Sequence, residues 1–325
     1  MPGANRIEFE VIEGWQHLPE GWSFVEVAGV ATDSKDRVYA FNRGEHPMIV
    51  FDADGKFLDA WGEGVFTNPH GIYIGPDDRV YCADNFDHTV RIFEPDGTLL
   101  KTLGEKDEPS DTGFMQGEMP VQRSAGPFNR VTNVALSQTG ELYVSDGYGN
   151  ARVHAFTAEG EHKFSWGEPG SGPGQFNLPH AIALDRYDRV YVADRENSRI
   201  QVFNTAGDYL TEWNHVTRPD DLYIDVDDNL YVAELGERAG LGPNVEVSPH
   251  APHARVSVLT LDGEIQTRFG GEDATAPGNF FAPHGIWADT KGDLYVSEVT
   301  YSAGGRWGMV PLDCHSLQKF VRIRG

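Results

Sequence analysis

A six-fold internal repeat constrains this chain of 325 residues more than any other feature. Each repeat contains a short strand that ends in a polar residue, and these strands read RVYAFN, RVYCAD, ELYVSD, RVYVAD, NLYVAE and DLYVSE. Their recurring end residues, among them Asp84, Asp146 and Asp194, are expected to be structural. Apolar and polar residues alternate between frequent turn signals, which favours short antiparallel strands over helices.

Four short strands repeated six times are typical of a β-propeller. The last repeat ends after its third strand, and the apolar segment IEFEVIEGW at 7–15 can supply the fourth, which would remove exposed strand edges. We therefore expect an all-β, six-bladed β-propeller that forms a single domain over residues 1–325. The predicted blades span approximately 28–66, 70–104, 131–168, 180–214, 220–270 and 284–325, and the strand at 7–15 completes the last.

The charge of the chain narrows the classes of partner. It carries 50 acidic and 26 basic residues, a net charge of −24. Binding to nucleic acid or to an anionic membrane surface requires Lys and Arg, so neither partner is expected. No segment approaches the roughly 18 apolar residues of a membrane span, and no signal-peptide pattern begins the chain. The sequence predicts a cytoplasmic protein whose oligomeric state is open.

Histidine recurs at one position of the repeat, immediately before the first strand. In blade order the residues there are Ala28, His70, Thr132, His180, Asp220 and His284. Alternate blades of a six-bladed ring are about 120° apart, so three imidazoles would converge on its axis. A strand cap after proline explains one such histidine but not an alternating set.

Three imidazoles with an open fourth position match a catalytic zinc site. We therefore expect one Zn²⁺ per chain on His70, His180 and His284, or another divalent transition metal in its place. Asp220 shares the ring, where it either orients a ligand or serves as a turn residue.

A second set of polar residues follows the second strands. Arg43 and Arg195 occupy the same repeat position, and Tyr148 falls one residue later in its blade. A guanidinium can bind a carboxylate through two hydrogen bonds, so the pair indicates a small anionic substrate. Tyr148 beside a dication could act as a general base. The alternatives are salt bridges between blades for the arginines and channel packing for the tyrosine.

Two insertions, 104–130 and 236–254, are longer than the other turns and rich in Gly and Pro. Long loops of this kind often cover functional sites, and we expect Phe114, Met115 and Met119 to supply apolar contacts to a ligand. His250 and His253 are expected to lie on an exposed loop rather than to form a second metal site.

These features resemble the lyase half of the peptide-amidating enzymes, the peptidyl-α-hydroxyglycine α-amidating lyase family. The likeness runs from FNRGEHPMIVFDADG through VSDGYGNARVHAF and LPHAIALDRYDRVYVADRENSRIQVF to the last PHGI, with VADREN and SDGYGN the most specific stretches. It implies a six-bladed propeller of NHL-like repeats with a three-histidine zinc site. The family's zinc ligands map to His70, His180 and His284, its catalytic tyrosine to Tyr148, and its active-site arginines to Arg43 and Arg195.

The family cleaves the C–N bond of a carbinolamide, R-CO-NH-CH(OH)-COO⁻, to an amide and glyoxylate. Gly149 stands where the family has a disulfide cysteine, and Gly285 where it has an aspartate linked to structural calcium. Ala282 also replaces the family's methionine two residues before the last histidine. The resemblance therefore carries over the metal chemistry, but neither the disulfide nor the calcium.

The leading hypothesis is a zinc-dependent lyase acting on a small N-acyl or N-carbamoyl α-hydroxyglycine-like substrate, with an amide and glyoxylate or a related carbonyl as products. Tyr148 would act as the base, and Arg43 or Arg195 would hold the carboxylate. Two alternatives stay open. One is a zinc-dependent hydrolase of a small amide, lactone or ester at the same three-histidine site. The other is a non-catalytic propeller that serves as a binding scaffold.

Overall fold

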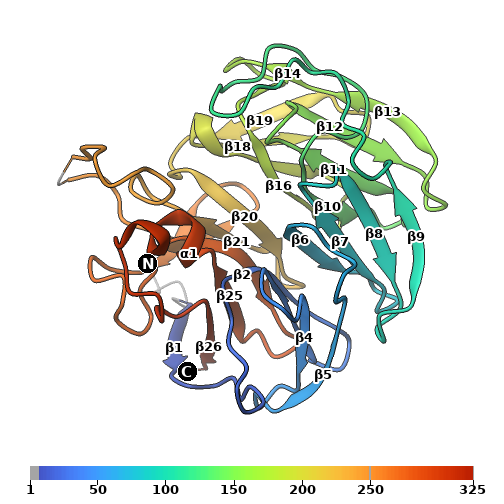
Figure 1. Cartoon of the computed structure of the whole chain (residues 1–325). Helices are drawn as coiled ribbons and strands as arrows, with labels where there is room; N and C mark the ends of the chain where they lie inside the picture. Colours follow the sequence, from blue (N-terminus) through green and yellow to red (C-terminus); the bar gives the residue numbers. More distant parts are fainter. Residues whose placement is uncertain (1–6, 249, 325) are drawn as a thin grey trace. The chain divides into compact units, whose positions relative to one another are not determined.

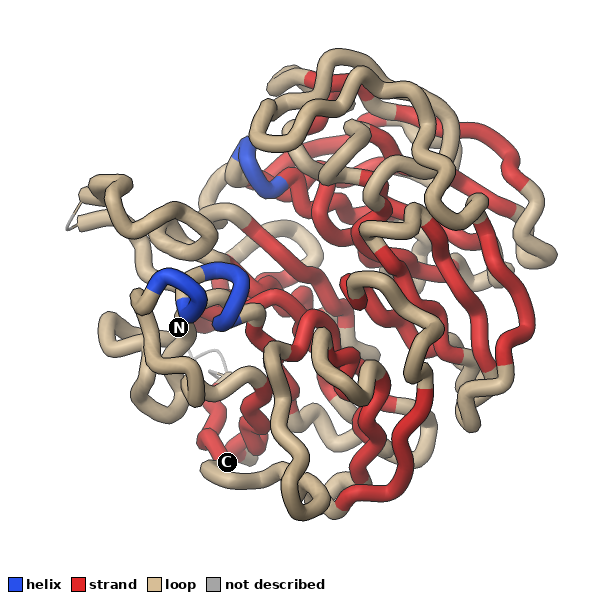
Figure 2. Tube along the Cα trace, in the orientation of Figure 1, coloured by secondary structure: helices blue, strands red, loops and turns tan. Residues whose placement is uncertain are grey.

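The computed structural model describes residues 7–248 and 250–324 and is nearly all-β (Figure 1). Six four-stranded sheets form the blades of a six-bladed β-propeller, as the repeat predicts. Figure 2 shows short strands alternating with loops and turns along the trace, with helix confined to short pieces. No helix of the described residues is long and apolar enough to cross a membrane.

Two compact units divide the chain, Met1–Ala60 with Tyr223–Gly325 as the first unit and Trp61–Leu222 as the second. The single-domain assignment for residues 1–325 stays a prediction.

The second unit contains blades two, three and four, each a sheet of antiparallel strands in chain order. Blade two has β6 (Pro69–Ile74), β7 (Val80–Asp84), β8 (Thr89–Phe93) and β9 (Leu99–Leu103). Blade three has β10 (Val131–Leu136), β11 (Leu142–Asp146), β12 (Arg152–Phe156) and β13 (His162–Trp166). Blade four has β16 (Pro179–Leu184), β17 (Val190–Asp194), β18 (Arg199–Phe203) and β19 (Tyr209–Trp213). The short pair β14 (Glu168–Pro169) and β15 (Gln175–Phe176) precedes β16, and the 3₁₀ turn η1 (Arg195–Asn197) follows β17.

The first unit contains the strands of blades one and six and most of blade five. Blade one has β2 (Val27–Thr32), β3 (Val38–Asn42), β4 (Met48–Phe51) and β5 (Phe57–Trp61), and blade five has β20 (Pro219–Ile224), β21 (Asn229–Glu234), β22 (Arg255–Thr260) and β23 (Ile265–Phe269). Blade six has β24 (Pro283–Ala288), β25 (Leu294–Glu298), β26 (Leu317–Ile323) and β1 (Glu8–Ile12), and its loop carries α1 (Thr300–Ala303) and η2 (Gly305–Trp307). β1 pairs antiparallel with β26, so the N-terminal strand completes the last blade as predicted.

In four of the blades, the tyrosine of the second strand has an aspartate partner in the preceding turn. In blade four, Asp185 accepts the N–H groups of Tyr187 and Arg189 at 2.9 Å, which is an aspartate-initiated turn. The buried Tyr191 donates its hydroxyl to the other oxygen of Asp185 at 3.0 Å. The same bond joins Tyr39 to Asp33, Tyr231 to Asp225 and Tyr295 to Asp289. Each tyrosine can therefore enter the core because its hydroxyl stays hydrogen-bonded.

Apolar side chains fill the spaces between neighbouring blades of one unit. In the second unit, β10 contacts both β6 and β16, and Val144, Val192 and Phe203 are among the buried residues of its two clusters. Burial of such a side chain contributes about 1.5–3 kcal/mol. This packing fixes the first strands, which carry the predicted metal ligands.

Candidate functional site

The residues that end the second strands fix the segments that lead into the histidine strands. In each histidine-bearing blade, a buried carboxylate accepts main-chain N–H bonds from the residues ahead of the first strand. The pairs are Thr67 and Asn68 with Asp84, Asn177 with Asp194, and Phe281 and Ala282 with Glu298, at 2.5 to 3.0 Å. The recurring acidic residues are thus structural, and they place His70, His180 and His284 at the starts of β6, β16 and β24.

All three histidines have the same hydrogen bond at Nδ1. The bonds run from His70 to the carbonyl of Thr132 at 2.7 Å, from His180 to that of Asp220 at 2.6 Å, and from His284 to that of Ala28 at 2.6 Å. A carbonyl only accepts, so Nδ1 must donate, and in the neutral ring the lone pair lies at Nε2. Such bonds set the tautomer and orientation of metal-binding histidines.

His70 and His180 lie together in the second unit, both 1% exposed, with ring centroids 4.8 Å apart. The ring of Tyr148 stands edge-on to both, at 5.3 and 5.5 Å. Tyr148 Oη lies 3.1 Å from His180 Nε2. Because Nε2 carries the lone pair, the tyrosine hydroxyl donates this bond, and a metal ion at Nε2 would compete with that hydrogen.

Arg195 connects Tyr148 to two carboxylates. Its Nη1 donates to Tyr148 Oη at 3.1 Å and to Asp220 Oδ1 at 3.2 Å, and its Nε donates to Glu196 at 2.9 Å. Burial lowers the pKa of Arg195, but the negative charges of Tyr148, Asp220 and Glu196 outweigh it and raise that pKa. Arg195 thus stays cationic, and Tyr148 Oη accepts a charge-assisted hydrogen bond from it.

Asp220 lies beside a histidine and an arginine. Its Oδ1 is 3.2 Å from His180 Nδ1 as well as from Arg195 Nη1. Burial raises the pKa of this carboxyl to about 6, although Arg195 lowers it. These contacts favour a role for Asp220 in orienting His180 over a role as a simple turn residue.

The structure changes the register of Tyr148. The N–H groups of Arg43, Tyr148 and Arg195 donate to the carbonyls of Glu26, Arg130 and Leu178, each two residues before the ring position of its blade. Tyr148 is therefore equivalent to the two arginines, and the one-residue offset in the aligned sequences is the extra Gly147. A Cβ at Gly147 would approach the carbon of the Pro179 carbonyl to 2.9 Å, so this bulge requires glycine.

The first unit holds His284 and Arg43. His284 is 5% exposed. Arg43 Nη1 donates to Glu26 Oε1 at 3.0 Å, and the other oxygen of Glu26 accepts the N–H of Ser302 at 2.7 Å. Glu26 is 2% exposed. Arg43 therefore has a carboxylate partner within the protein, as Arg195 does.

The two glycines that depart from the amidating-lyase pattern are closely packed. A Cβ at Gly149 would lie 2.8 Å from the carbonyl oxygen of Asn129, and one at Gly285 would lie 2.8 Å from Gly29 Cα. Larger side chains at either position would require the backbone to move.

The donor set fits a transition metal. Within the described part of the chain, His70, His180 and His284 are the buried group that could hold a metal ion. Three neutral imidazoles presenting Nε2 suit Zn²⁺ and its neighbours in the first transition row, whereas Ca²⁺ and Mg²⁺ take oxygen ligands.

A cavity of about 410 Å³ adjoins Tyr148 in the second unit. It is lined by Phe114, Gln116, Gly117, Met119, Arg130, Tyr148, Asn177, Leu178, Arg195 and Glu196. Two of the three apolar residues expected to contact a ligand, Phe114 and Met119, thus face it, whereas Met115 is 54% exposed. The insertion at 104–130 therefore supplies one wall of a ligand-sized cavity.

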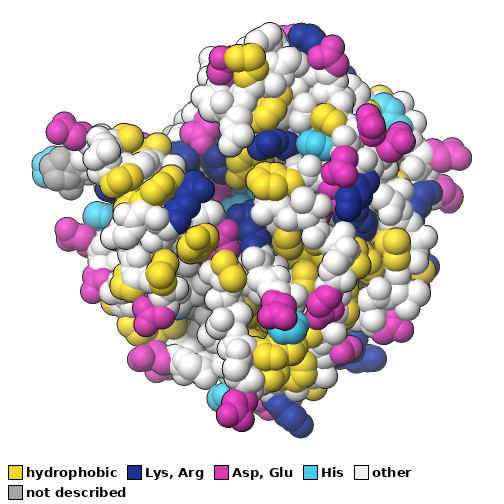
Figure 3. All heavy atoms as spheres, viewed as in Figure 1, with side chains coloured by type: hydrophobic (Ala, Val, Ile, Leu, Met, Phe, Trp, Pro, Cys, Tyr) yellow, Lys and Arg dark blue, Asp and Glu magenta, His cyan; other side chains and the backbone are white. Residues whose placement is uncertain are grey.

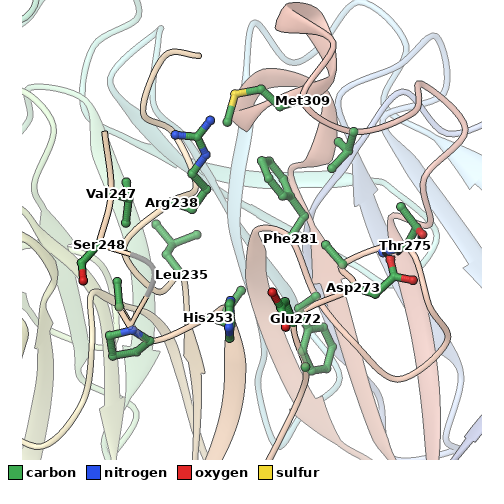
Figure 4. A pocket seen from close by; sticks show the side chains of 17 residues that line it. Leu235, Arg238, Val247, Ser248, His253, Glu272, Asp273, Thr275, Phe281 and Met309 are labelled. Carbon is green, nitrogen blue, oxygen red and sulfur yellow. Dashed lines mark hydrogen bonds between the residues drawn. The ribbon is translucent and has the colours of Figure 1, made fainter. Parts of the chain in front are cut away.

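The first unit has a cavity of about 560 Å³. Figure 4 looks into it, with Leu235 and Arg238 on one side and Phe281, Glu272 and Asp273 on the other. The insertion at 236–254 contributes its wall, including His253. No cavity is predicted at this place by the sequence.

Sequence reasoning also missed Glu26, Arg130 and Glu196. Glu26 and Arg130 occupy one repeat position, two residues before Ala28 and Thr132. The charged residues at this position of the aligned repeats could have identified Glu26 and Arg130 from the sequence. Acidic side chains are spread over the face drawn in Figure 3, so surface charge alone does not single out these residues.

Comparisons with known proteins agree with this architecture. The family model "NHL repeat" matches residues 176–203, which include β17 and Arg195. Human "NHL repeat-containing protein 3" is 34% identical over 220 residues, 65% of this chain and 61% of that protein. The Drosophila melanogaster "Peptidyl-alpha-hydroxyglycine alpha-amidating lyase 1" is 29% identical over 264 residues, 76% of this chain and 46% of that protein. The alignments thus span less than two thirds of either relative.

A solved structure titled "Streptogramin B lyase structure" matches with a TM-score of 0.61 and 13% identity, covering 98% of each chain, which shows a shared fold. The name of the human relative states a repeat and no reaction, whereas that of the fly relative states a lyase. The chain is a six-bladed β-propeller that contains an NHL repeat and is similar in sequence to peptidyl-α-hydroxyglycine α-amidating lyases.

Proposed function

We propose that this protein is a zinc-dependent carbon–nitrogen lyase that splits a small anionic carbinolamide into an amide and glyoxylate. One observation carries the proposal: Tyr148 Oη lies 3.1 Å from His180 Nε2 and 3.1 Å from Arg195 Nη1. A phenol between a metal-type imidazole nitrogen and a guanidinium is suited to remove a proton from a hydroxyl group.

His70, His180 and His284 would hold the metal, which when bound supplies Lewis-acid polarisation of the substrate hydroxyl. A metal held at His180 Nε2 would replace the hydrogen bond that Tyr148 makes there. Arg195 still donates to Tyr148 Oη and stabilises the phenolate. Asp220 holds both His180 and Arg195, so one buried carboxylate orients the ligand and the cation together.

Tyr148, as the phenolate, accepts the proton of the carbinol hydroxyl. The oxygen of that hydroxyl then forms the C=O of glyoxylate, and the electron pair of the breaking C–N bond stays on nitrogen. The nitrogen takes up one proton, which Tyr148 can return, so the products are R-CO-NH₂ and OHC-COO⁻. No water is consumed, which distinguishes this reaction from hydrolysis of an amide or ester.

The test is glyoxylate release from α-hydroxyhippurate and from ureidoglycolate by zinc-loaded protein, with a chelator-treated sample beside it. Release should require metal, be lost in His180→Ala, and fall by about 10²–10⁴-fold in Tyr148→Phe. Matched controls are His162→Ala and Tyr187→Phe, two exposed residues of the second unit. Absence of glyoxylate with verified zinc would refute the lyase. Release of free acid and amine would assign a hydrolase instead.

A further inference from the structure

Arg130 is a cation in the cavity beside Tyr148 that no step of the proposed reaction uses. Its guanidinium carbon lies 4.7 Å from the ring centroid of Phe114 and 5.0 Å from that of Phe86. Contacts of this kind are attractive and hold a guanidinium in place. Arg130 therefore faces a ligand-sized cavity in a fixed position.

The two arginines selected from the sequence already have carboxylate partners. Arg43 pairs with Glu26, and Arg195 pairs with Asp220 and Glu196. Within the described chain, Arg130 forms no ion pair. Burial lowers its pKa, and an electrostatic interaction with Tyr148 opposes this in part. A partly buried cation without a counter-charge is unfavourable, so a bound anion would be stabilised here.

The repeat shows which residue is missing. Arg218 occupies the position of Arg130 two blades later, and both have a positive φ, 48° and 62°. Arg218 pairs at 3.1 Å with Glu196, which follows the second strand of the preceding blade. The equivalent residue before Arg130 is Phe86, since the N–H groups of Asn85 and Arg195 donate to equivalent carbonyls. An aromatic ring thus stands where the repeat can supply a carboxylate.

The backbone of Arg130 is held on both sides. Its N–H donates to His88 Nδ1 at 3.0 Å, and its carbonyl accepts the N–H of Tyr148 at 3.4 Å. The left-handed region is unfavourable for a non-glycine residue, and these two contacts keep Arg130 there. Arg130 is therefore positioned relative to Tyr148 before any ligand binds.

We propose that Arg130 binds a carboxylate of the substrate in this cavity, supplying the anion contact expected from Arg43 or Arg195. The assignment rests on the proposed lyase function, which defines the substrate. That substrate can present a carboxylate on its hydroxyglycine end or at the far end of its acyl group. The walls formed by Phe114, Met119 and Leu178 suit an acyl chain of several carbons.

The affinities of three probes for the zinc-loaded protein, measured by calorimetry, distinguish the two ends of the substrate. Butanamide has no carboxylate, N-butanoylglycine has one at the glycine end, and succinamate has one at the acyl end. Arg130→Gln should weaken one or both carboxylate probes by about 10-fold or more, and butanamide by less than twofold. Arg130→Lys should restore part of the loss. Arg79→Gln, an exposed arginine of blade two, is the charge-matched control.

A gain of carboxylate at Phe86 provides a reciprocal test. Phe86 is 48% exposed, so substitution there should leave the fold intact. Phe86→Glu should pair with Arg130 as Glu196 pairs with Arg218, and should weaken the same probes more than Phe86→Gln, which removes the ring without adding a charge. Turnover of N-butanoyl- and N-succinyl-α-hydroxyglycine then identifies the end concerned. Loss in Arg130→Gln on both substrates indicates the hydroxyglycine carboxylate, and loss confined to the succinyl substrate indicates the acyl end.

Wild-type affinity of Arg130→Gln for all three probes would overturn the assignment, as would an equal loss that includes butanamide. Because binding is measured without turnover, an intact Arg130 effect in a protein that releases no glyoxylate would refute the lyase and leave the anion site standing.

Discussion

Replacing Asp220 with asparagine should weaken metal binding by about 10-fold. His180 would keep its 2.6 Å bond to the main-chain carbonyl of residue 220 and lose only the 3.2 Å contact with a charged oxygen. Loss of such a partner typically costs 10–100-fold in metal affinity. Because the shorter bond survives, we expect the lower limit, which is equivalent to about 1.4 kcal/mol.

The assay is competition for Zn²⁺ with a chromophoric chelator at fixed pH. Asp221→Asn is the matched control, since the same chemical change falls one residue along, on a carboxylate bonded to Asn133 at 2.8 Å. An affinity of Asp220→Asn within twofold of wild type, or an equal loss in Asp221→Asn, would refute the role of Asp220 in orienting His180.

Three further predictions concern the fold and the surroundings of the site. Burial alone would lower the pKa of His315, but its hydrogen bond to Glu298 raises that pKa above 6.5. The pair should therefore stabilise the protein fully below pH 6.5 and lose this effect as the pH rises through the raised pKa. The difference in melting temperature between wild type and His315→Gln should shrink as the pH rises, and a difference that grows with pH would contradict this. Deleting residues 1–12 removes β1 and exposes the edge of β26, so light scattering should report association and the melting temperature should fall, whereas a wild-type melting curve would show that closure is dispensable. Gly149→Ala should lower kcat severalfold, because the added Cβ would push Asn129 and the adjoining Tyr148 apart. Gly140→Ala is the control for backbone strain alone, since Gly140 has a φ of +81° and its added Cβ would meet only Ala158, at 3.6 Å.

The fold was predictable because its information is repeated. Six copies of one pattern average out local ambiguity, and the alternation of histidine at the ring position survives any small error in strand limits. Tyr148 shows the limit of alignment, since Gly147 displaces it by one residue in sequence but not in the hydrogen-bond pattern. Its equivalence to Arg43 and Arg195 required coordinates.

Ion pairing was less predictable, because it depends on which side chains meet across blades. Both arginines chosen from the sequence turned out to have carboxylate partners, Glu26 for Arg43 and Asp220 for Arg195. Arg130 was passed over because it lies inside a long insertion rather than after a strand. The absence of a carboxylate beside it among the described residues becomes visible only when Phe86 and Glu196 are compared in space.

The hydrogen bonds at the histidine Nδ1 atoms recur in every second blade, although the strands themselves repeat in every blade. The blade after each histidine-bearing blade accepts this bond at the main-chain carbonyl of its ring residue, which is Thr132, Asp220 or Ala28. A carbonyl makes no demand on the side chain of its residue. That freedom accounts for three chemically unrelated residues at the alternate positions, and it left one of them, Asp220, able to acquire a second role beside Arg195.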